Sequence, residues 1–281
     1  MALVPMKELL LDAERGNYSV GAFSVANMEM ILGAVKAAEE LKSPMILQVA
    51  QVRLPYSPLH VIAPLMIAAA KKASVPVAVH LDHGKTIDCI EEALELGFTS
   101  VMIDASDKPI EENVRLTKQV KELAERYGAT VEAEVGQIGV SEDGTKDGER
   151  IYSDPQEVKR LKEETGVDAI ALSIGNAHGL YKDEPRLNFD VLEKSRELTE
   201  MPLVLHGGTG ISEEDFKRCI EGGIRKINVA TGTFMAVEQA AREYAKEEKR
   251  DYFRLSAHMA ELAYENVKNH IRIFGSEGRA E

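Results

Sequence analysis

The stretch VAVHLDHGKTIDCIEEALELGFTSVMI, from Val77 to Ile103, decides the fold of this chain. It begins with the largely apolar run Val77–Leu81, continues through an amphipathic segment of helical period, and ends in a second apolar run, Ser100–Ile103. Short apolar runs of this kind are typical of strands that are buried on both faces, as in parallel sheets. The stretch therefore predicts a strand, a helix and a second strand in succession.

The same unit recurs along the chain. The strand candidates, in order, are Val20–Phe23, Met45–Val49, Val77–Leu81, Ser100–Ile103, Thr130–Glu134, Ala169–Leu172, Leu203–Leu205 and Ile224–Val229. Helical segments separate them, and Pro109–Tyr127 shows the usual asymmetry of a proline at its start and a glycine, Gly128, after its end. Eight such units in one uninterrupted alternation predict an α/β protein with a (β/α)8 TIM barrel, and a doubly wound sheet is the alternative. The tail Ser256–Phe274 predicts an extra C-terminal helix, and without any linker residues 1–281 are expected to form one domain.

Composition narrows the class of protein. The 34 Lys and Arg against 47 Asp and Glu give a net charge of −13, which disfavours nucleic acid as a partner because its phosphates require basic patches. No run approaches the roughly 18 apolar residues of a membrane span. Met1–Leu11 carries charges within its apolar stretch, unlike a secretory signal, and Cys89 and Cys219 do not make a disulfide framework. We therefore expect a soluble, cytoplasmic protein that binds no membrane.

Three of the seven histidines follow strand candidates. His83 lies after the third strand, His178 after the sixth and His206 after the seventh. In a (β/α)8 barrel the active site is built at the C-terminal ends of the strands, so these side chains are expected on one face. Three imidazoles with an open fourth position are the ligand set of a catalytic zinc. His80, by contrast, is expected inside the barrel with its hydrogen bonds satisfied. The helical segments contain His60, His258 and His270, which are expected to be solvated.

Carboxylates accompany these histidines. Asp82 directly precedes His83, Asp104 ends the fourth strand, and Glu134 ends the fifth. Asp82 can orient a ligand histidine, or it can act as a general acid/base that moves a substrate hydroxyl proton. Its position alone does not distinguish these two roles.

Two connections have unusual composition. The turn Gly207–Gly210 precedes Ser212, a predicted helix start, so backbone N–H groups and a helix N-terminus face one place beside the end of strand eight. Loops after strands seven and eight form the common phosphate site of these barrels, and main-chain amides can bind phosphate even in an acidic protein. The nineteen residues from Gly136 to Asp154 are expected to form a mobile lid.

Taken together, these motifs resemble the class II, zinc-dependent ketose-bisphosphate aldolases, a family that includes fructose- and tagatose-bisphosphate aldolases. The runs that carry the resemblance are Val79–Gly84 (VHLDHG), Ile174–Gly179 (IGNAHG), Leu205–Gly210 (LHGGTG) and Lys226–Val229 (KINV). The likeness extends over essentially the whole chain, as far as Phe274-Gly275-Ser276.

The resemblance implies a set of metal ligands. Zinc is expected on His83, His178 and His206, while Asp104 and Glu134 match positions that hold a second divalent metal in some members. Some members also respond to a monovalent cation. Family members are commonly homodimers or homotetramers, so a homo-oligomer is expected here.

The resemblance also implies the reaction, which is reversible retro-aldol cleavage of a ketose 1-phosphate, such as fructose or tagatose 1,6-bisphosphate, to dihydroxyacetone phosphate and an aldehyde. Asp82 would handle the C4 hydroxyl proton and Glu142, in the lid, the proton at C3. The residues that match the dihydroxyacetone-phosphate site are Gly179, Gly207, Gly208, Thr209, Asn228, Val229, Ala230 and Thr231.

This chemistry agrees with the residues. Cleavage leaves negative charge on a carbonyl oxygen, which a Lewis-acidic zinc stabilises. The other aldolase strategy needs a Schiff-base lysine, and strand six, Ala169–Ser173, has none. Lys226 shares the face of Asn228 but is expected deeper in the barrel, in a buried ion pair.

The chain departs from the family pattern toward the aldehyde end of the substrate. Ser24 replaces a usual Asn, and Ala50, Gln51, Val52 and Arg53 replace a Ser-Glu-Gly or Ser-Asn-Gly stretch. Ser24, Gln51 and Arg53 are the candidate contacts there, and an arginine suits a carboxylate as well as a phosphate. We therefore predict that the 1-phosphate is required and the second phosphate is not, so that a hydroxyl or carboxylate terminus is accepted.

Two other functions are weighed against the aldolase. A metal-dependent barrel hydrolase would use a zinc-bound hydroxide, but such barrels usually offer a His-x-His pair on strand one, and Val20–Ser24 has no histidine. A non-catalytic sugar-phosphate sensor would not need the intact histidine set together with Asp82 and Glu142.

Overall fold

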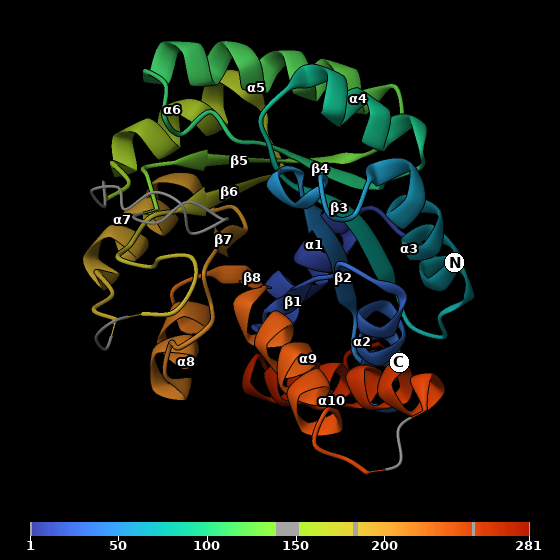
Figure 1. The fold of residues 1–281 in the computed structure, drawn as a ribbon. Helices are drawn as coiled ribbons and strands as arrows, with labels where there is room; N and C mark the ends of the chain where they lie inside the picture. The colour runs from blue at the N-terminus through green and yellow to red at the C-terminus, as the bar shows by residue number, and fades with distance from the viewer. Residues whose placement is uncertain (1, 139–151, 182–184, 249–250, 281) are drawn as a thin grey trace.

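A computed structural model describes residues 2–138, 152–181, 185–248 and 251–280 (Figure 1). Its eight parallel strands pair in chain order, and β1 pairs with β8 to close a barrel. The strands are Val20–Ser24 (β1), Met45–Ala50 (β2), Val77–Gly84 (β3), Ser100–Ile103 (β4), Thr130–Val135 (β5), Ala169–Leu172 (β6), Leu203–Leu205 (β7) and Ile224–Val229 (β8). The predicted (β/α)8 barrel is confirmed, and the doubly wound alternative is wrong.

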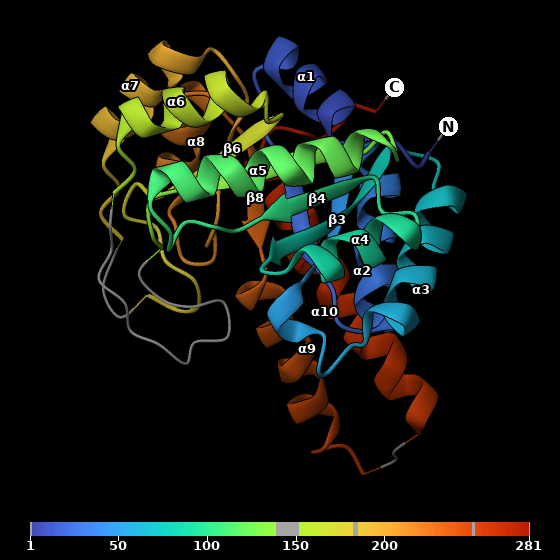
Figure 2. The same cartoon turned by 90° about the horizontal axis from the view of Figure 1, so that it is seen from above.

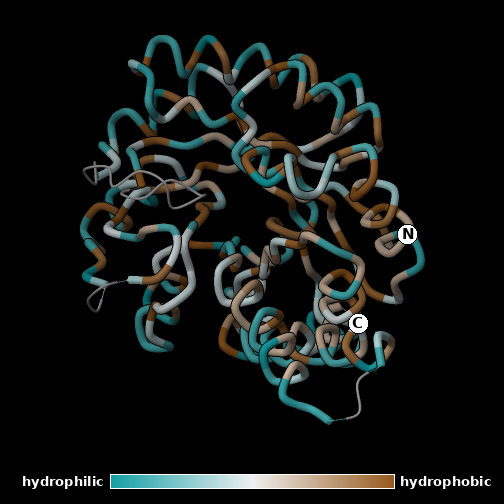
Figure 3. The backbone as a smooth tube through the Cα atoms, viewed as in Figure 1, coloured by the Kyte–Doolittle hydropathy of each residue, from teal (hydrophilic) through white to brown (hydrophobic). Residues whose placement is uncertain are grey.

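A helix follows each strand and packs on the outside of the barrel. These helices are Met28–Glu40 (α2), Leu59–Lys72 (α3), Ile87–Glu95 (α4), Ile110–Glu125 (α5), Pro155–Thr165 (α6), Phe189–Thr199 (α7), Glu213–Glu221 (α8) and Thr231–Tyr244 (α9). In Figure 3 the strands are mostly brown and the outer helices alternate between brown and teal, as expected of strands buried on both faces and of amphipathic helices. None of the described helices is long and apolar enough to cross a membrane.

Short polar side chains begin several of these helices. Ser212 Oγ accepts a hydrogen bond from the backbone N–H of Asp215 at 3.1 Å, so the predicted start of α8 is confirmed. Asp154 caps α6 in the same way, with Pro155 in the first helical position. The left-handed φ of +65° at Gly128 follows α5, where the sequence predicted that the helix would end.

Three of the described elements lie outside the eight repeats. The extra C-terminal helix is confirmed as α10, Tyr252–Ile273, which starts four residues before the predicted segment and packs on α2 and α9. A short 3-10 helix, η1 (Gln51–Arg53), follows β2. The third is α1, Met6–Gly16, which no sequence pattern predicted.

Helix α1 closes one end of the barrel, as Figure 2 shows. Its buried Met6, Leu9 and Leu10 join an apolar cluster with small and branched residues of the strands. The strand members of this cluster are Val20, Ala22, Ile46, Ala78, Ala169, Ala171 and Val204. Helix α1 thus covers the N-terminal end of the strands with apolar contacts. An open site can therefore lie only at their C-terminal end.

Candidate active site

Strand β3 delivers two adjacent side chains to the mouth of the barrel. Successive residues of a regular strand point to opposite faces. The β3–β4 register shifts between Leu81 and Gly84, and His83 has a left-handed φ of +43°, so Asp82 and His83 are both buried at the same site. Gly84 is required next to them, because a Cβ there would lie 2.4 Å from the carbonyl oxygen of Met102.

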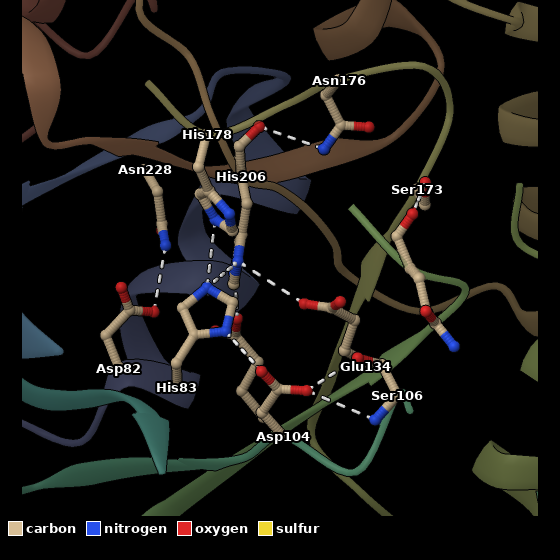
Figure 4. Close-up of polar contacts among 12 residues, drawn as sticks. Asp82, His83, Asp104, Ser106, Glu134, Ser173, Asn176, His178, His206 and Asn228 are labelled. Atoms are coloured by element: carbon tan, nitrogen blue, oxygen red, sulfur yellow. Dashed lines mark hydrogen bonds and ion pairs between the residues drawn. The ribbon is translucent and has the colours of Figure 1, made fainter. Parts of the chain in front are cut away.

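The three predicted histidines meet at this mouth (Figure 4). His83 Nε2 lies 3.2 Å from His178 Nε2 and 2.9 Å from His206 Nδ1. Two imidazole nitrogens bound to one tetrahedral zinc at 2.0–2.1 Å would lie about 3.3 Å apart. The spacing and the all-nitrogen donor set therefore fit a single zinc ion.

A carboxylate orients each of two of these rings. Asp104 Oδ2 lies 2.7 Å from His83 Nδ1, and Glu132 Oε1 lies 2.8 Å from His206 Nε2. A ring nitrogen that donates to a carboxylate leaves the other nitrogen free to bind metal. His83 and His178 therefore present Nε2 to the common centre, while His206 presents Nδ1.

The predicted second-metal residues lie beside the same histidines. Asp104, Glu134 and His83 are close enough to share an ion, and Glu134 Oε2 is a buried oxygen with no hydrogen-bond partner among the described residues. Asp104 is already engaged, because it accepts from His83, from Ser106 at 2.7 Å and from Lys85 Nζ at 2.6 Å.

The electrostatics of the site favour positive charge. Burial lowers the pKa of His83, but the nearby carboxylates of Asp82, Asp104 and Glu134 outweigh this and raise it to about 10. Burial, with the charge of Asp104, raises the pKa of Glu134 to about 8. Burial together with the charge of His83 holds the pKa of His206 well below its usual range. The surroundings of His83 therefore favour its protonated form, and a bound cation would take the place of that proton.

Asp82 is held by amides. Gln48 Nε2 donates to Asp82 Oδ2 and Asn228 Nδ2 donates to Oδ1, each at 3.1 Å, and Gln48 also donates to Ser24 Oγ. Among the described contacts no histidine donates to this carboxylate. The geometry therefore favours the acid/base role of Asp82 over the role of orienting a ligand.

A cavity opens beside Asp82. Its lining residues are Gln48, Asp82, His178, Gly179, Gly207, Thr209, Asn228, Ala230 and Thr231. The predicted phosphate residues Gly208 and Val229 are not among them, since Gly208 N donates to the Asn228 carbonyl at 3.0 Å and Val229 is fully buried. The first turn of α9 begins at Thr231, so its backbone N–H groups and the glycine-rich loop can meet an anion here.

Tyr181 joins the loops that follow β6 and β7. Its hydroxyl accepts from Ala177 N at 2.9 Å and donates to the Gly207 carbonyl at 3.0 Å, and its ring packs near Gly210. The bridge fixes the loop of His178 against the loop that follows His206.

The predicted aldehyde-end residues do not line the described cavity. Ser24 Oγ accepts a hydrogen bond from Gln48 Nε2 at 3.1 Å. Gln51 Oε1 accepts from Lys85 N at 2.6 Å and so holds the approach to α4. Arg53 stacks on the Phe234 ring, with 5.7 Å from its guanidinium carbon to the ring centroid. Glu142 and residues 139–151 of the predicted lid lie outside the described residues, so the lid stays a prediction.

Comparison with known proteins agrees with this geometry. Residues 4–279 match the family model described as fructose-bisphosphate aldolase class-II. The chain belongs to this family. Class II aldolases are lyases that act on sugar phosphates. This chain is therefore an aldolase of that class.

Several relatives align along their full length. The aldolase is 43% identical over 287 residues to fructose-bisphosphate aldolase of Geobacillus stearothermophilus, covering 100% of this chain and 99% of the relative. It is 41% identical over 285 residues to fructose-bisphosphate aldolase of Staphylococcus aureus strain Mu50, covering 100% of both. The crystal structure of the YdjI aldolase from Escherichia coli K12 matches with a TM-score of 0.90 at 36% identity, covering 99% of this chain and 100% of that one.

Sequence reasoning missed three residues of the site. Glu132 precedes Glu134 by two positions and therefore shares its face of β5, which is a usable signal. Gln48 is a lone polar residue within the apolar run MILQVA. Nothing in the sequence alone indicated that the Tyr181 hydroxyl would bridge two loops.

Proposed function

We propose that this aldolase holds a zinc ion on His83 Nε2, His178 Nε2 and His206 Nδ1 and reversibly cleaves a ketose 1-phosphate to dihydroxyacetone phosphate and an aldehyde. The convergence of three buried imidazole nitrogens at the barrel mouth carries the proposal. When bound, zinc supplies Lewis acidity toward the negative charge that cleavage leaves on a carbonyl oxygen.

Asp82 takes the proton of the C4 hydroxyl as the C3–C4 bond breaks. Gln48 and Asn228 hold its two oxygens from either side, so the carboxylate stays oriented beside the cavity without substrate. Such pre-positioning of a general base contributes to the rate because no rearrangement is needed in the transition state. Glu142 is proposed to move the proton at C3.

The 1-phosphate binds where Gly179, Gly207, Thr209, Ala230 and Thr231 line the cavity. Here the donors are backbone N–H groups at the start of α9 and the Thr hydroxyls, which suit a phosphate without a net positive patch. The described lining contains no lysine or arginine that would bind a second phosphate. Our proposal that a terminal hydroxyl or carboxylate is accepted in place of the second phosphate rests on the sequence at Ser24 and at residues 50–53, which lie outside this lining.

Three further features complete the proposal. A second divalent ion would bind Asp104 and Glu134, and would compete with His83 and Lys85 for Asp104. A response to a monovalent cation and a homodimeric or homotetrameric assembly follow the family pattern.

The test combines metal removal with a substrate screen. Chelation should abolish release of dihydroxyacetone phosphate from ketose 1-phosphates, and added zinc should restore it. Borohydride should trap no substrate on the protein, since no Schiff base forms. Full activity of metal-free protein would overturn the zinc proposal.

The substrate range is decided by kcat/KM for bisphosphates against matched 1-monophosphates. We expect comparable values. A preference of 100-fold or more for a bisphosphate, about 2.7 kcal/mol of transition-state binding, would show that a second phosphate site exists.

A further inference from the structure

A buried ion pair lies beneath the three histidines. Lys226 of β8 and Glu132 of β5 are both fully buried, and Lys226 Nζ lies 2.8 Å from Glu132 Oε2, in an ion pair whose angles are not those of a hydrogen bond. The other oxygen, Oε1, accepts the Nε2 proton of His206 at 2.8 Å. A lysine from one side of the barrel is thus linked through a carboxylate to a proposed zinc ligand on another strand.

Burying this ion pair costs free energy of desolvation. Transferring an ammonium and a carboxylate from water to a protein interior costs several kcal/mol per ion, and their attraction often only offsets that cost. Apolar side chains would fill the same volume with comparable stability. A role beyond packing is therefore needed to explain a fully buried lysine at this position.

Glu132 has a second potential partner, which makes its orientation important. His80 Nε2 lies 3.8 Å from Glu132 Oε2, while His80 Nδ1 is bonded to Ser100 Oγ at 2.7 Å. The His80 Nε2 atom has no hydrogen-bond partner among the described residues, so the location of His80 inside the barrel is confirmed but the expectation that its hydrogen bonds are satisfied is wrong for this nitrogen. Without Lys226 the carboxylate could turn toward His80 and release His206.

We propose that Lys226 is a positioning residue that acts through Glu132 to keep the Nδ1 lone pair of His206 directed at the metal. The inference rests on the proposed zinc site. Lys226 binds Oε2, Oε1 then faces His206, and the ring carries its proton on Nε2. Asp104 also joins a lysine to a proposed ligand histidine, but there His83 and Lys85 both contact Oδ2.

The first measurement is the zinc dissociation constant of the full chain, by competition with a chelator, for Lys226→Met. Groups that orient metal ligands typically contribute 10- to 100-fold in affinity, so we expect a loss of that size. The matched control is Lys121→Met, which removes a lysine from the buried Asp168 carboxylate at 2.7 Å, in a pair that touches none of the site residues. Its zinc affinity should equal that of the wild type.

A second pair of variants gives a result that a purely structural ion pair would not. In Glu132→Gln, Lys226 can only donate, so it selects the amide oxygen and turns the amide NH2 toward His206 Nε2. The ring must then carry its proton on Nδ1, the atom meant for zinc. Adding Lys226→Met frees the amide to turn its oxygen to His206, so the double variant should bind zinc more tightly than Glu132→Gln alone. The double variant also removes both charges of this ion pair, which keeps the test open if Lys226→Met alone fails to fold.

The proton position on His206 is read directly from its ring ¹⁵N chemical shifts in the metal-free chain. We expect the Nε2–H form in the wild type and a shift toward Nδ1–H in Glu132→Gln. Unchanged zinc affinity in Lys226→Met, or no gain on adding it to Glu132→Gln, would overturn the inference. If the wild type bound no zinc, the proposed function would fail, whereas the ¹⁵N shifts of the metal-free variants would still decide whether Lys226 positions His206.

Discussion

Gly207→Ala should damage the active site through a single methyl group. Gly207 has a φ of +65°, and an added Cβ would lie 2.1 Å from the carbonyl oxygen of Ala177. The oxygen belongs to the backbone and the Cβ position is fixed by the backbone, so neither atom can rotate away, and contacts at such distances essentially never occur. The loop after β7 or the loop after β6 must therefore move by about an ångström to reach ordinary van der Waals separation.

The cost has two parts. The left-handed conformation disfavours alanine by roughly 1–2 kcal/mol, and accommodating the methyl group adds about 1–3 kcal/mol of strain. The moving loops carry His178 and the backbone proposed to bind the phosphate, and a shift of about 1 Å in a catalytic constellation can cost about 10²-fold in rate. We expect kcat/KM to fall by about that factor.

Gly166→Ala is the matched control. Gly166 has a φ of +64°, follows α6 at the opposite end of the barrel, and an added Cβ there would meet nothing within 4 Å. Gly166→Ala isolates the cost of the left-handed conformation. Urea unfolding should show a free energy of unfolding lower by about 1–2 kcal/mol, and kcat/KM should be unchanged. Equal kcat/KM in Gly207→Ala and Gly166→Ala would refute the argument that the two loops are packed too closely for a side chain.

Three further outcomes are expected. Asp82→Ala should lower kcat by about 10²–10⁴-fold while bound zinc, measured by elemental analysis, stays at the wild-type level; loss of zinc instead would make Asp82 a support of the ligands. Glu142→Ala should slow exchange of the C3 proton of dihydroxyacetone phosphate into solvent without weakening its binding, and unchanged exchange would remove Glu142 from the mechanism. Tyr181→Phe removes the hydroxyl that bridges Ala177 and Gly207, so KM for the ketose phosphate should rise roughly tenfold at constant zinc content. An unchanged KM would show that the bridge does not shape the phosphate site.

Some expectations about single residues depended on surroundings that a sequence does not show. His270 is expected to be solvated because it lies on a helix, yet it is half-buried and its Nδ1 bonds the Asn266 carbonyl at 2.8 Å. Helix α1 was not predicted because its apolar face gains a partner only when the barrel has closed above it. The burial of α1 comes from strand residues distant in the sequence, whereas the printed partner of His270 lies four residues earlier in α10.

The sequence by itself determined the alternation of strands and helices, since each depends on a local period and on capping residues a few positions apart. It also determined that His83, His178 and His206 would share one end of the barrel, because every parallel strand ends on the same side. The burial of Lys226 in an ion pair followed from its place along β8 relative to Asn228.

Only the tertiary structure decided which polar groups touch. Glu132 bonds a histidine 74 positions away, and Asn228 bonds Asp82 across 146 positions. Such contacts depend on how the strands are staggered around the barrel and on the irregularity that turns Asp82 and His83 to one side. A shift of one residue in register sends a side chain to the other face, so pairing across the barrel becomes defined only when all eight strands have closed.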